Sequence, residues 1–131
     1  MIINDFTPAE IDIIIPQGST VQEFFTIYTD AAQTVPMDLT DYTGITTWRK
    51  FPGSAIIEFQ VNLLIGAQLV NGVITPASPA NGGIAITYLD TATSLVPLNE
   101  CGYQRDVVLT DSTGVNRVII IGQVTFLGEI T

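Results

Sequence analysis

Residues 82–114 read GGIAITYLDTATSLVPLNECGYQRDVVLTDSTG, and this stretch decides the fold. Apolar residues alternate with small or polar ones over residues 84–88, which is typical of a strand that buries one face. Asp90 is placed to be the N-cap of a single helical turn that ends at a proline. Gly102 and Tyr103 then open a second alternating strand. The order of strand, helical turn and strand is typical of the closing half of a β-sandwich.

Turn-forming residues also separate short predicted strands on both sides of this stretch. The residues DSTG at positions 111–114 predict a hairpin turn that leads into the last strand. Val, Ile and Thr dominate the segments between the proline and glycine signals, and these residue types favour strands. Gly122, in the last strand, is expected to mark a β-bulge. The predicted strands outside the opening stretch cover residues 10–15, 20–29, 42–51, 55–64 and 116–126.

These signals predict an all-β fold, an immunoglobulin-like antiparallel β-sandwich of about seven strands with one short helical turn. A chain of 131 residues corresponds to a single domain. Residues 65–82 are rich in Gly, Ala, Asn and Pro and are expected to be an insertion, with a small extra strand at residues 73–75. Residues 1–15 are expected to hold the first strand and an arm for assembly.

Four residues are assigned structural roles. Tyr103 follows a helical corner at the start of a strand, as in a tyrosine corner, where the hydroxyl bonds the backbone of the preceding connection. Trp48 lies on the third predicted strand and matches the core tryptophan of such sandwiches. Gly102 opens the strand of Tyr103, and Asp90 caps the turn before it. The alternative for Trp48 is an exposed position on which a sugar ring stacks.

The composition is acidic but sparsely charged. The chain has 13 acidic and 4 basic residues, a net charge of −9, and a mean hydropathy of +0.42. Two interpretations follow: a monomer with a surface of Thr, Ser, Gln and Asn, or a subunit whose apolar surface is covered by neighbours. The scattered basic residues argue against nucleic-acid binding, which needs clustered Lys and Arg. No apolar run is long enough to predict a membrane span, and no signal peptide is evident.

The chemistry available to the chain is narrow. There is no histidine, which removes His-based catalysis and His-ligated metal sites. The single cysteine, Cys101, cannot form an intrachain disulfide, which fits synthesis in a reducing cytoplasm. Carboxylate pairs such as Asp38 with Asp41, or Asp106 with Asp111, are the remaining acid–base candidates. We expect no enzymatic activity, no cofactor and no metal, with calcium at the acidic loops left as an open alternative.

Apolar residues outside the predicted core pattern are the candidates for contacts with other proteins. They fall in the N-terminal arm, in the insertion and along the edge of the last strand. The residues assigned to such an interface are Ile11, Ile13, Ile14, Ile15, Leu64, Ile65, Val70 and Val73.

Three segments resemble small structural domains of tailed-phage particles. Residues 10–43, EIDIIIPQGSTVQEFFTIYTDAAQTVPMDLTDYT, are similar to the opening of tail and baseplate domains, although Asp41 stands where glycine is common. TTWRK at residues 46–50 is similar to their third strand, and LTDSTGVNRVIIIGQVTFLGEIT at residues 109–131 to their closing hairpin. The final residues 128–131 depart from the Ser-Pro-Glu wording of that family. The resemblance is closest to N-terminal domains of upper-baseplate or fibre-anchoring proteins.

This resemblance implies a non-enzymatic structural subunit of a phage virion, in the tail, the baseplate or the fibre attachment. Its partners would be other virion proteins, with self-association into a homo-oligomer as a further expectation, and it would bind neither nucleic acid nor membrane. Two alternatives remain open. One is a decoration protein on the capsid, and the other is a carbohydrate-binding module for host surface glycans that uses Trp48 with Tyr28, Tyr42 or Tyr88.

Overall fold

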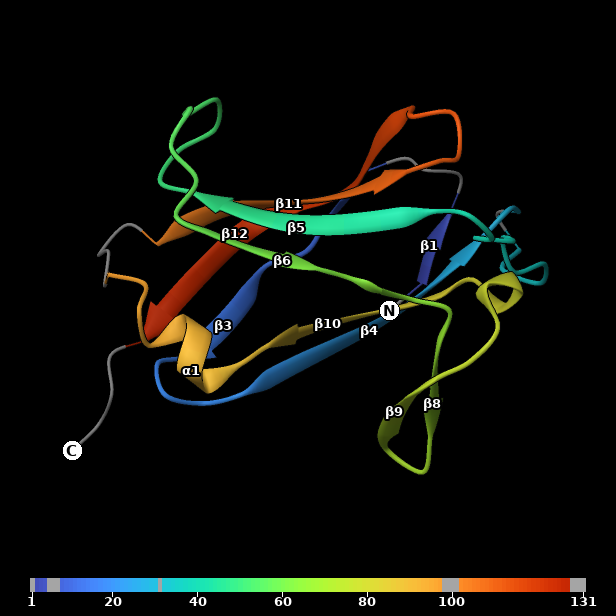
Figure 1. The fold of residues 1–131 in the computed structure, drawn as a ribbon, viewed down its shortest axis with the longest axis horizontal. Coiled ribbons are helices and arrows are strands. Elements are labelled where there is room, and N and C mark those ends of the chain that lie inside the picture. The colour runs from blue at the N-terminus through green and yellow to red at the C-terminus, as the bar shows by residue number, and fades with distance from the viewer. Residues whose placement is uncertain (1, 5–7, 31, 98–101, 128–131) are drawn as a thin grey trace.

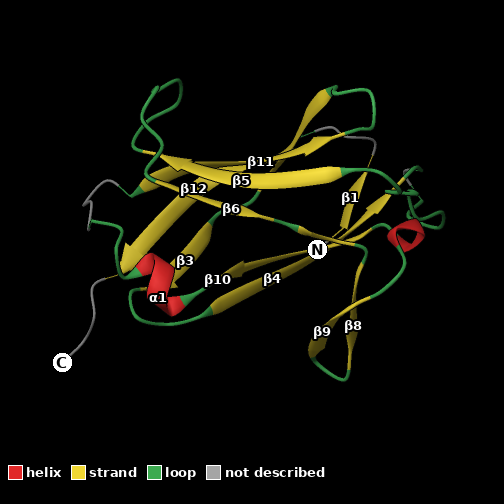
Figure 2. Ribbon diagram, viewed as in Figure 1, coloured by secondary structure: helices red, strands yellow, loops and turns green. Residues whose placement is uncertain are grey.

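Two β-sheets pack face to face in the computed structural model, which describes residues 2–4, 8–30, 32–97 and 102–127 (Figure 1). Cys101 and residues 128–131 lie outside this part of the chain. One helical turn, α1, closes one end of the sandwich, and a small hairpin projects near the other end, as Figure 2 shows by secondary structure. The prediction of an all-β, immunoglobulin-like sandwich is confirmed.

The first sheet has four strands in the order β1-β4-β10-β7. β4 and β10 are antiparallel and form its centre, while β1 pairs with β4 in parallel and β7 adds a short edge. The bounds are β1 (Ile2–Asn4), β4 (Val21–Tyr28), β7 (Leu64–Ile65) and β10 (Gly83–Tyr88).

The second sheet has six strands in the order β2-β12-β11-β5-β6, with β3 also paired to β12. β12, β11, β5 and β6 run antiparallel, whereas β2 and β3 lie parallel to β12. The bounds are β2 (Ala9–Glu10), β3 (Ile13–Pro16), β5 (Thr43–Arg49), β6 (Phe59–Asn62), β11 (Tyr103–Thr110) and β12 (Asn116–Leu127).

The core lies between the sheets, and the alternation of side chains along a strand is clearest in β11 and β12. β11 alternates strictly between buried and half-buried residues along its eight positions. β12 alternates in the same way after a local irregularity, where Val107 pairs with Ile120 but Val108 pairs with Val118. The predicted bulge is therefore at Ile119 and not at Gly122, which pairs regularly with Arg105.

The N-terminal segment is part of the sandwich. β1 lies on the first sheet, and β2 and β3 lie on the second, so the chain crosses from one sheet to the other over its first strands. Ile11 and Ile15 are core residues, 9% and 0% exposed. The expected first strand is thus present as β2 and β3, and the described part of residues 1–15 pairs with both sheets; residues 1 and 5–7 lie outside the described part.

The predicted fourth strand is shorter than expected and changes sheets. Only β6 pairs with β5, and Ile57, within the predicted strand at residues 55–64, is 48% exposed. The segment before β6 loops outward and rejoins β5 through a hydrogen bond of 2.9 Å from the Glu58 amide to the Trp48 carbonyl. After Leu63 the chain enters the first sheet as β7.

The predicted insertion contains a β-hairpin that projects beyond the first sheet (Figure 1). β8 (Ala67–Val70) and β9 (Val73–Pro76) pair antiparallel, so the expected small strand at residues 73–75 is present. The turn residues Asn71 and Gly72 have φ angles of 51° and 77°. This pair of positive angles is what a two-residue Asn-Gly hairpin turn requires. A single 3-10 turn (Pro79–Asn81) then leads into β10.

Candidate functional site

Trp48 lies at the centre of an aromatic cluster between the sheets. It is fully buried, and its ring centroid lies 4.5 Å from that of Phe59, 5.5 Å from Tyr88, 5.9 Å from Tyr103 and 6.0 Å from Phe126. These separations are in the range that favours aromatic pairs. Trp48 is therefore a core residue, and the alternative of an exposed, sugar-stacking tryptophan is wrong. Tyr88 is buried as well, so the proposed row of exposed aromatic residues does not exist in this form.

Tyr103 forms the expected tyrosine corner. Its side chain is buried, and its hydroxyl donates a hydrogen bond to the carbonyl of Pro97 in the connection after α1 (Asp90–Thr93). Gly102 precedes it with a φ of 68°, and a Cβ there would lie 2.4 Å from the Val124 carbonyl oxygen. Both the turn and the close approach of β12 therefore require glycine at this position.

We expect the substitution Tyr103→Phe to lower the free energy of unfolding by about 1 kcal/mol, because the Pro97 carbonyl loses its donor while the ring remains in place. Urea denaturation measures this loss. The matched control is Tyr28→Phe, a half-exposed tyrosine on β4, which we expect to change stability by less than about 0.5 kcal/mol. Equal losses for the two variants would mean that the corner hydrogen bond contributes nothing.

Asp90 is displaced by one position from its predicted role. The N-cap of α1 is Leu89, which makes no side-chain cap, and Asp90 is the first helical residue. The Asp90 amide instead donates to the Thr20 hydroxyl at 3.1 Å, and its carboxylate accepts from the Thr91 amide at 2.8 Å. The cap thus comes from a residue distant in sequence, which local pattern reasoning does not reveal.

A buried ion pair connects the two sheets, and the sequence analysis did not anticipate it. Arg105 on β11 is 3% exposed, and its guanidinium donates to both carboxylate oxygens of Glu23 on β4, at 2.5 and 3.1 Å. The same guanidinium donates to the carbonyl of Ile11 at 2.8 and 3.2 Å and to the Tyr88 hydroxyl at 3.0 Å. Arg105 therefore joins both sheets and the N-terminal segment.

Tyr88 completes this network by donating its hydroxyl to Glu23 at 2.9 Å. Burial, followed by the nearby Glu23 carboxylate, raises the pKa of Tyr88, so the hydroxyl stays protonated as a donor. A signal for the pair was present in the sequence. Glu23 alternates with the inward residues Phe25 and Ile27, and Arg105 alternates with inward residues of β11, so opposite charges occupy inward positions on facing strands.

The carboxylates proposed as acid–base pairs are used elsewhere. Asp38 accepts from the Thr40 hydroxyl and amide, at 2.6 and 2.9 Å, and these hydrogen bonds lower its pKa. Asp111 accepts in the same way from Thr113, which lowers its pKa too. With folded pKa values below the unfolded ones, both groups stabilise the fold above the unfolded pKa, and this contribution is lost as the pH falls.

Asp106 and Asp111 cannot act together. Asp106 lies within β11 and Asp111 follows its end, so the rise of a strand places them roughly 16 Å apart. That exceeds the separation of about 5–9.5 Å used by paired carboxylates. Among the described residues, no group of three or more His, Cys, Asp or Glu side chains is placed to hold a metal ion.

The structure divides the predicted interface residues into two groups. Buried or half-buried against the core are Ile11, Ile13, Ile15 and Ile65. For Ile11 and Ile15 the prediction of an interface is corrected, because the facing sheet covers them. Exposed are Ile14, Leu64, Val70 and Val73, at 63%, 40%, 47% and 59%. Leu69, which the prediction missed, is 52% exposed beside Val70 on the projecting hairpin.

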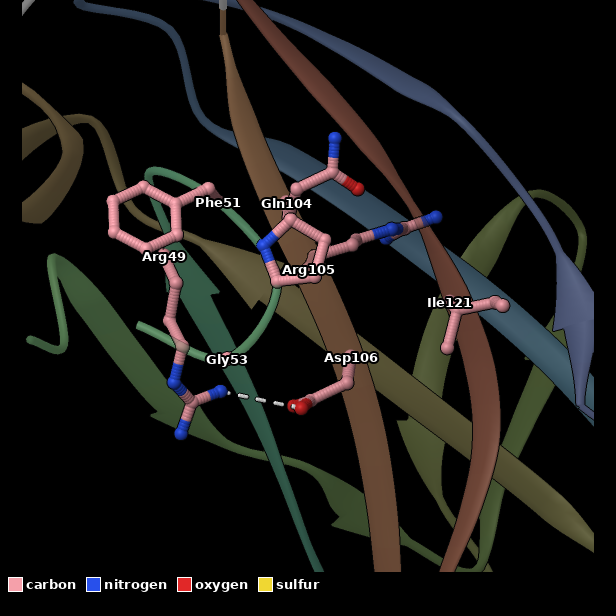
Figure 3. A pocket seen from close by; sticks show the side chains of 8 residues that line it. Arg49, Phe51, Gly53, Gln104, Arg105, Asp106 and Ile121 are labelled. Atoms are coloured by element: carbon pink, nitrogen blue, oxygen red, sulfur yellow. Dashed lines mark hydrogen bonds and ion pairs between the residues drawn. The ribbon is translucent and has the colours of Figure 1, made fainter. Parts of the chain in front are cut away.

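The outer face of the second sheet carries a hollow of about 250 Å³ (Figure 3). Arg49 and Asp106 form its ion pair, with 3.2 Å between Nη1 and Oδ2. Phe51 and Ile121 lie on opposite sides of that pair, and Gln104 lies above it in the view. The Oδ1 atom of Asp106 is buried and has no hydrogen-bond partner among the described residues. Sequence reasoning did not single out these residues, since the hollow depends on strands β5, β11 and β12 being adjacent.

Comparisons with known proteins identify no relative: no protein-family model matches the chain, and no curated protein sequence matches it. In the described part of the chain, no helix has the length and apolarity to cross a membrane. The function must therefore be argued from the geometry and from the resemblance given above.

Proposed function

We propose that this domain is a non-enzymatic structural subunit of a phage virion, located in the tail, the baseplate or the fibre attachment, and that it acts by docking onto other virion proteins. The observation that carries the proposal is the projecting hairpin of β8 and β9. It presents Leu69, Val70 and Val73, each about half exposed, outside both main sheets. The sequence resemblance to tail and baseplate domains supports the same role.

The hairpin has the properties of a contact element on a rigid base. Gly83 of β10 lies directly under its first strand, because a Cβ on Gly83 would lie 1.9 Å from the Ala67 carbonyl oxygen. The Asn81 side chain donates to that carbonyl at 2.9 Å and accepts from the Gly83 amide at 2.8 Å. The base of the hairpin is therefore fixed to the first sheet while its tip presents apolar side chains, as a docking element requires.

The net charge of −9 supports a subunit that stays dispersed before assembly. Charge of one sign keeps a free protein soluble, although exposed apolar side chains favour association. Docking would bury the apolar tip of the hairpin against a neighbour that carries complementary apolar surface. A second copy of this chain is the competing occupant, and the mass of the purified domain distinguishes the two.

We expect the double substitution Leu69→Asp/Val73→Asp to prevent incorporation of the chain into phage particles. The new carboxylates would have to be desolvated in the interface, which costs several kcal/mol, whereas both side chains are solvated in the free domain. The measurement is the amount of the chain in purified particles, by mass spectrometry, with thermal unfolding of the free variant as a check on folding.

The matched control is Val115→Asp, an equally exposed valine at the tip of the hairpin between β11 and β12. We expect this variant to be incorporated normally. Normal incorporation of the Leu69→Asp/Val73→Asp variant would exclude the hairpin as the docking element. Location of the chain on the particle head would instead support a decoration protein, which uses the same kind of contact.

A further inference from the structure

We infer that the hollow beside Phe51 is a binding site for a neutral sugar ring, a pyranose that lies against Phe51 and donates a hydroxyl to Asp106. This site goes beyond the proposed virion role and does not depend on it. It also differs from the alternative of a row of tryptophan and tyrosine side chains, since Trp48 is buried.

The walls of the hollow suit a ring with one apolar face. Phe51 is 60% exposed and Ile121 is 46% exposed, and both line the hollow from opposite sides of the view in Figure 3. A pyranose presents a face of C–H groups that packs on an aromatic ring, while its hydroxyls point outward around the edge. The volume of about 250 Å³ is below the range of roughly 300–1,000 Å³ for drug-sized ligands, and therefore suits a single ring.

The polar groups at the base of the hollow can form hydrogen bonds with the hydroxyls of a ligand. Gln104 and Asp106 alternate with the inward Arg105 on β11, so their side chains lie on the outer face of the sheet. The Asp106 side chain is 30% exposed, and its Oδ2 atom, which accepts from Arg49 at 3.2 Å, can accept a further hydrogen bond. One ligand hydroxyl can donate to Oδ2, and an adjacent one can accept from Arg49, as vicinal hydroxyls of a sugar do.

The electrostatics select a neutral ligand. Arg49 and Asp106 compensate each other inside the hollow, so a cation or an anion would meet one group of its own sign. A second hollow, of about 240 Å³, shares Gln104 and Ile121 with the first and contains Glu10 and Asp12. These carboxylates, together with the net charge of −9, disfavour acidic sugars and phosphates, while carboxylates and amides are good partners for neutral hydroxyls.

The test is saturation-transfer and amide-shift NMR of the purified domain with methyl glycosides of neutral hexoses and N-acetylhexosamines, and with glucuronic acid for comparison. We expect at least one neutral glycoside to bind with a Kd of about 1 mM and to shift the amides of Gly53, Gln104 and Ile121. We expect Phe51→Ala to weaken this binding about tenfold, because it removes the stacking surface. Asp106→Ala should weaken it similarly, since the hydroxyl loses its acceptor.

The control variant is Leu95→Ala, a residue 83% exposed just after α1, which should bind like the unaltered domain. The inference is overturned if no neutral glycoside binds at about 20 mM, well above the expected Kd. It is also overturned if the shifted amides lie elsewhere, if Phe51→Ala binds normally, or if glucuronic acid binds as well as the neutral rings. Thermal unfolding of each variant confirms that lost binding does not reflect lost folding.

Discussion

Replacing Arg105 with methionine is expected to lower the free energy of unfolding by about 3–5 kcal/mol. The methionine fills much of the same space, but Glu23 then keeps a buried carboxylate with no opposite charge. The Ile11 carbonyl and the Tyr88 hydroxyl also lose the donors that Arg105 supplies. Urea denaturation measures the loss, provided that the m-value, the dependence of the unfolding free energy on urea concentration, is the same for both proteins.

Two further variants separate the ion pair from the volume of the side chain. Arg49→Met breaks a pair whose partners are both about 30% exposed, and we expect it to cost less than about 1 kcal/mol. Arg105→Met/Glu23→Leu removes both buried charges, and we expect it to be more stable than Arg105→Met alone. A loss for Arg105→Met no larger than that for Arg49→Met would contradict the role assigned to this network.

The second large effect is expected from Gly122→Ala, which should destabilise the domain by about 3 kcal/mol. A Cβ at this position would lie 2.0 Å from the carbonyl oxygen of Ile11, the atom that accepts from Arg105. The backbone around Ile11 must then move, and this loosens its amide hydrogen bond to Ile121 at 2.9 Å. The close approach to Ile11, and not a β-bulge, therefore explains the glycine at this position.

Gly53→Ala is the matched control for this substitution. Gly53 has a φ of 82° and open space around its Cβ position, so the change costs only the strain of the left-handed backbone, about 1 kcal/mol. Hydrogen exchange provides a second measurement, since in Gly122→Ala the amides of residues 11 and 121–124 should lose protection. Equal stability of the two alanine variants would contradict this account, because β2 and β3 would then adapt to the added methyl group at a cost of only about 1 kcal/mol.

The fold could be predicted because its signals are local. The alternation in β11 and the helical corner before Tyr103 each depend on neighbouring residues, and the structure shows both. The alternation expected in β10 is not found, because this central strand of the first sheet is buried along almost its whole length. Trp48 was identified by its position on the third strand in the same way. Local signals fail by one residue at Asp90, where the distant Thr20 supplies the cap.

The remaining features depend on contacts between segments far apart in the chain. Glu23 and Arg105 are separated by 82 residues, and only the packing of the two sheets brings them together. The run of isoleucines at 13–15 shows that the segment is apolar but not what covers it; β12 and the facing sheet bury Ile15 and leave Ile14 exposed. The hollow beside Phe51 likewise requires the order of strands, which the sequence does not state.

The most direct test of the proposed function is cryo-electron microscopy of tailed-phage particles purified from cells that express the chain from its native gene. The account predicts density for this sandwich at symmetric positions in the tail, baseplate or fibre attachment, with the β8–β9 hairpin buried against a neighbouring protein. Particles that lack the chain, together with a free domain that remains monomeric in light scattering, would contradict it.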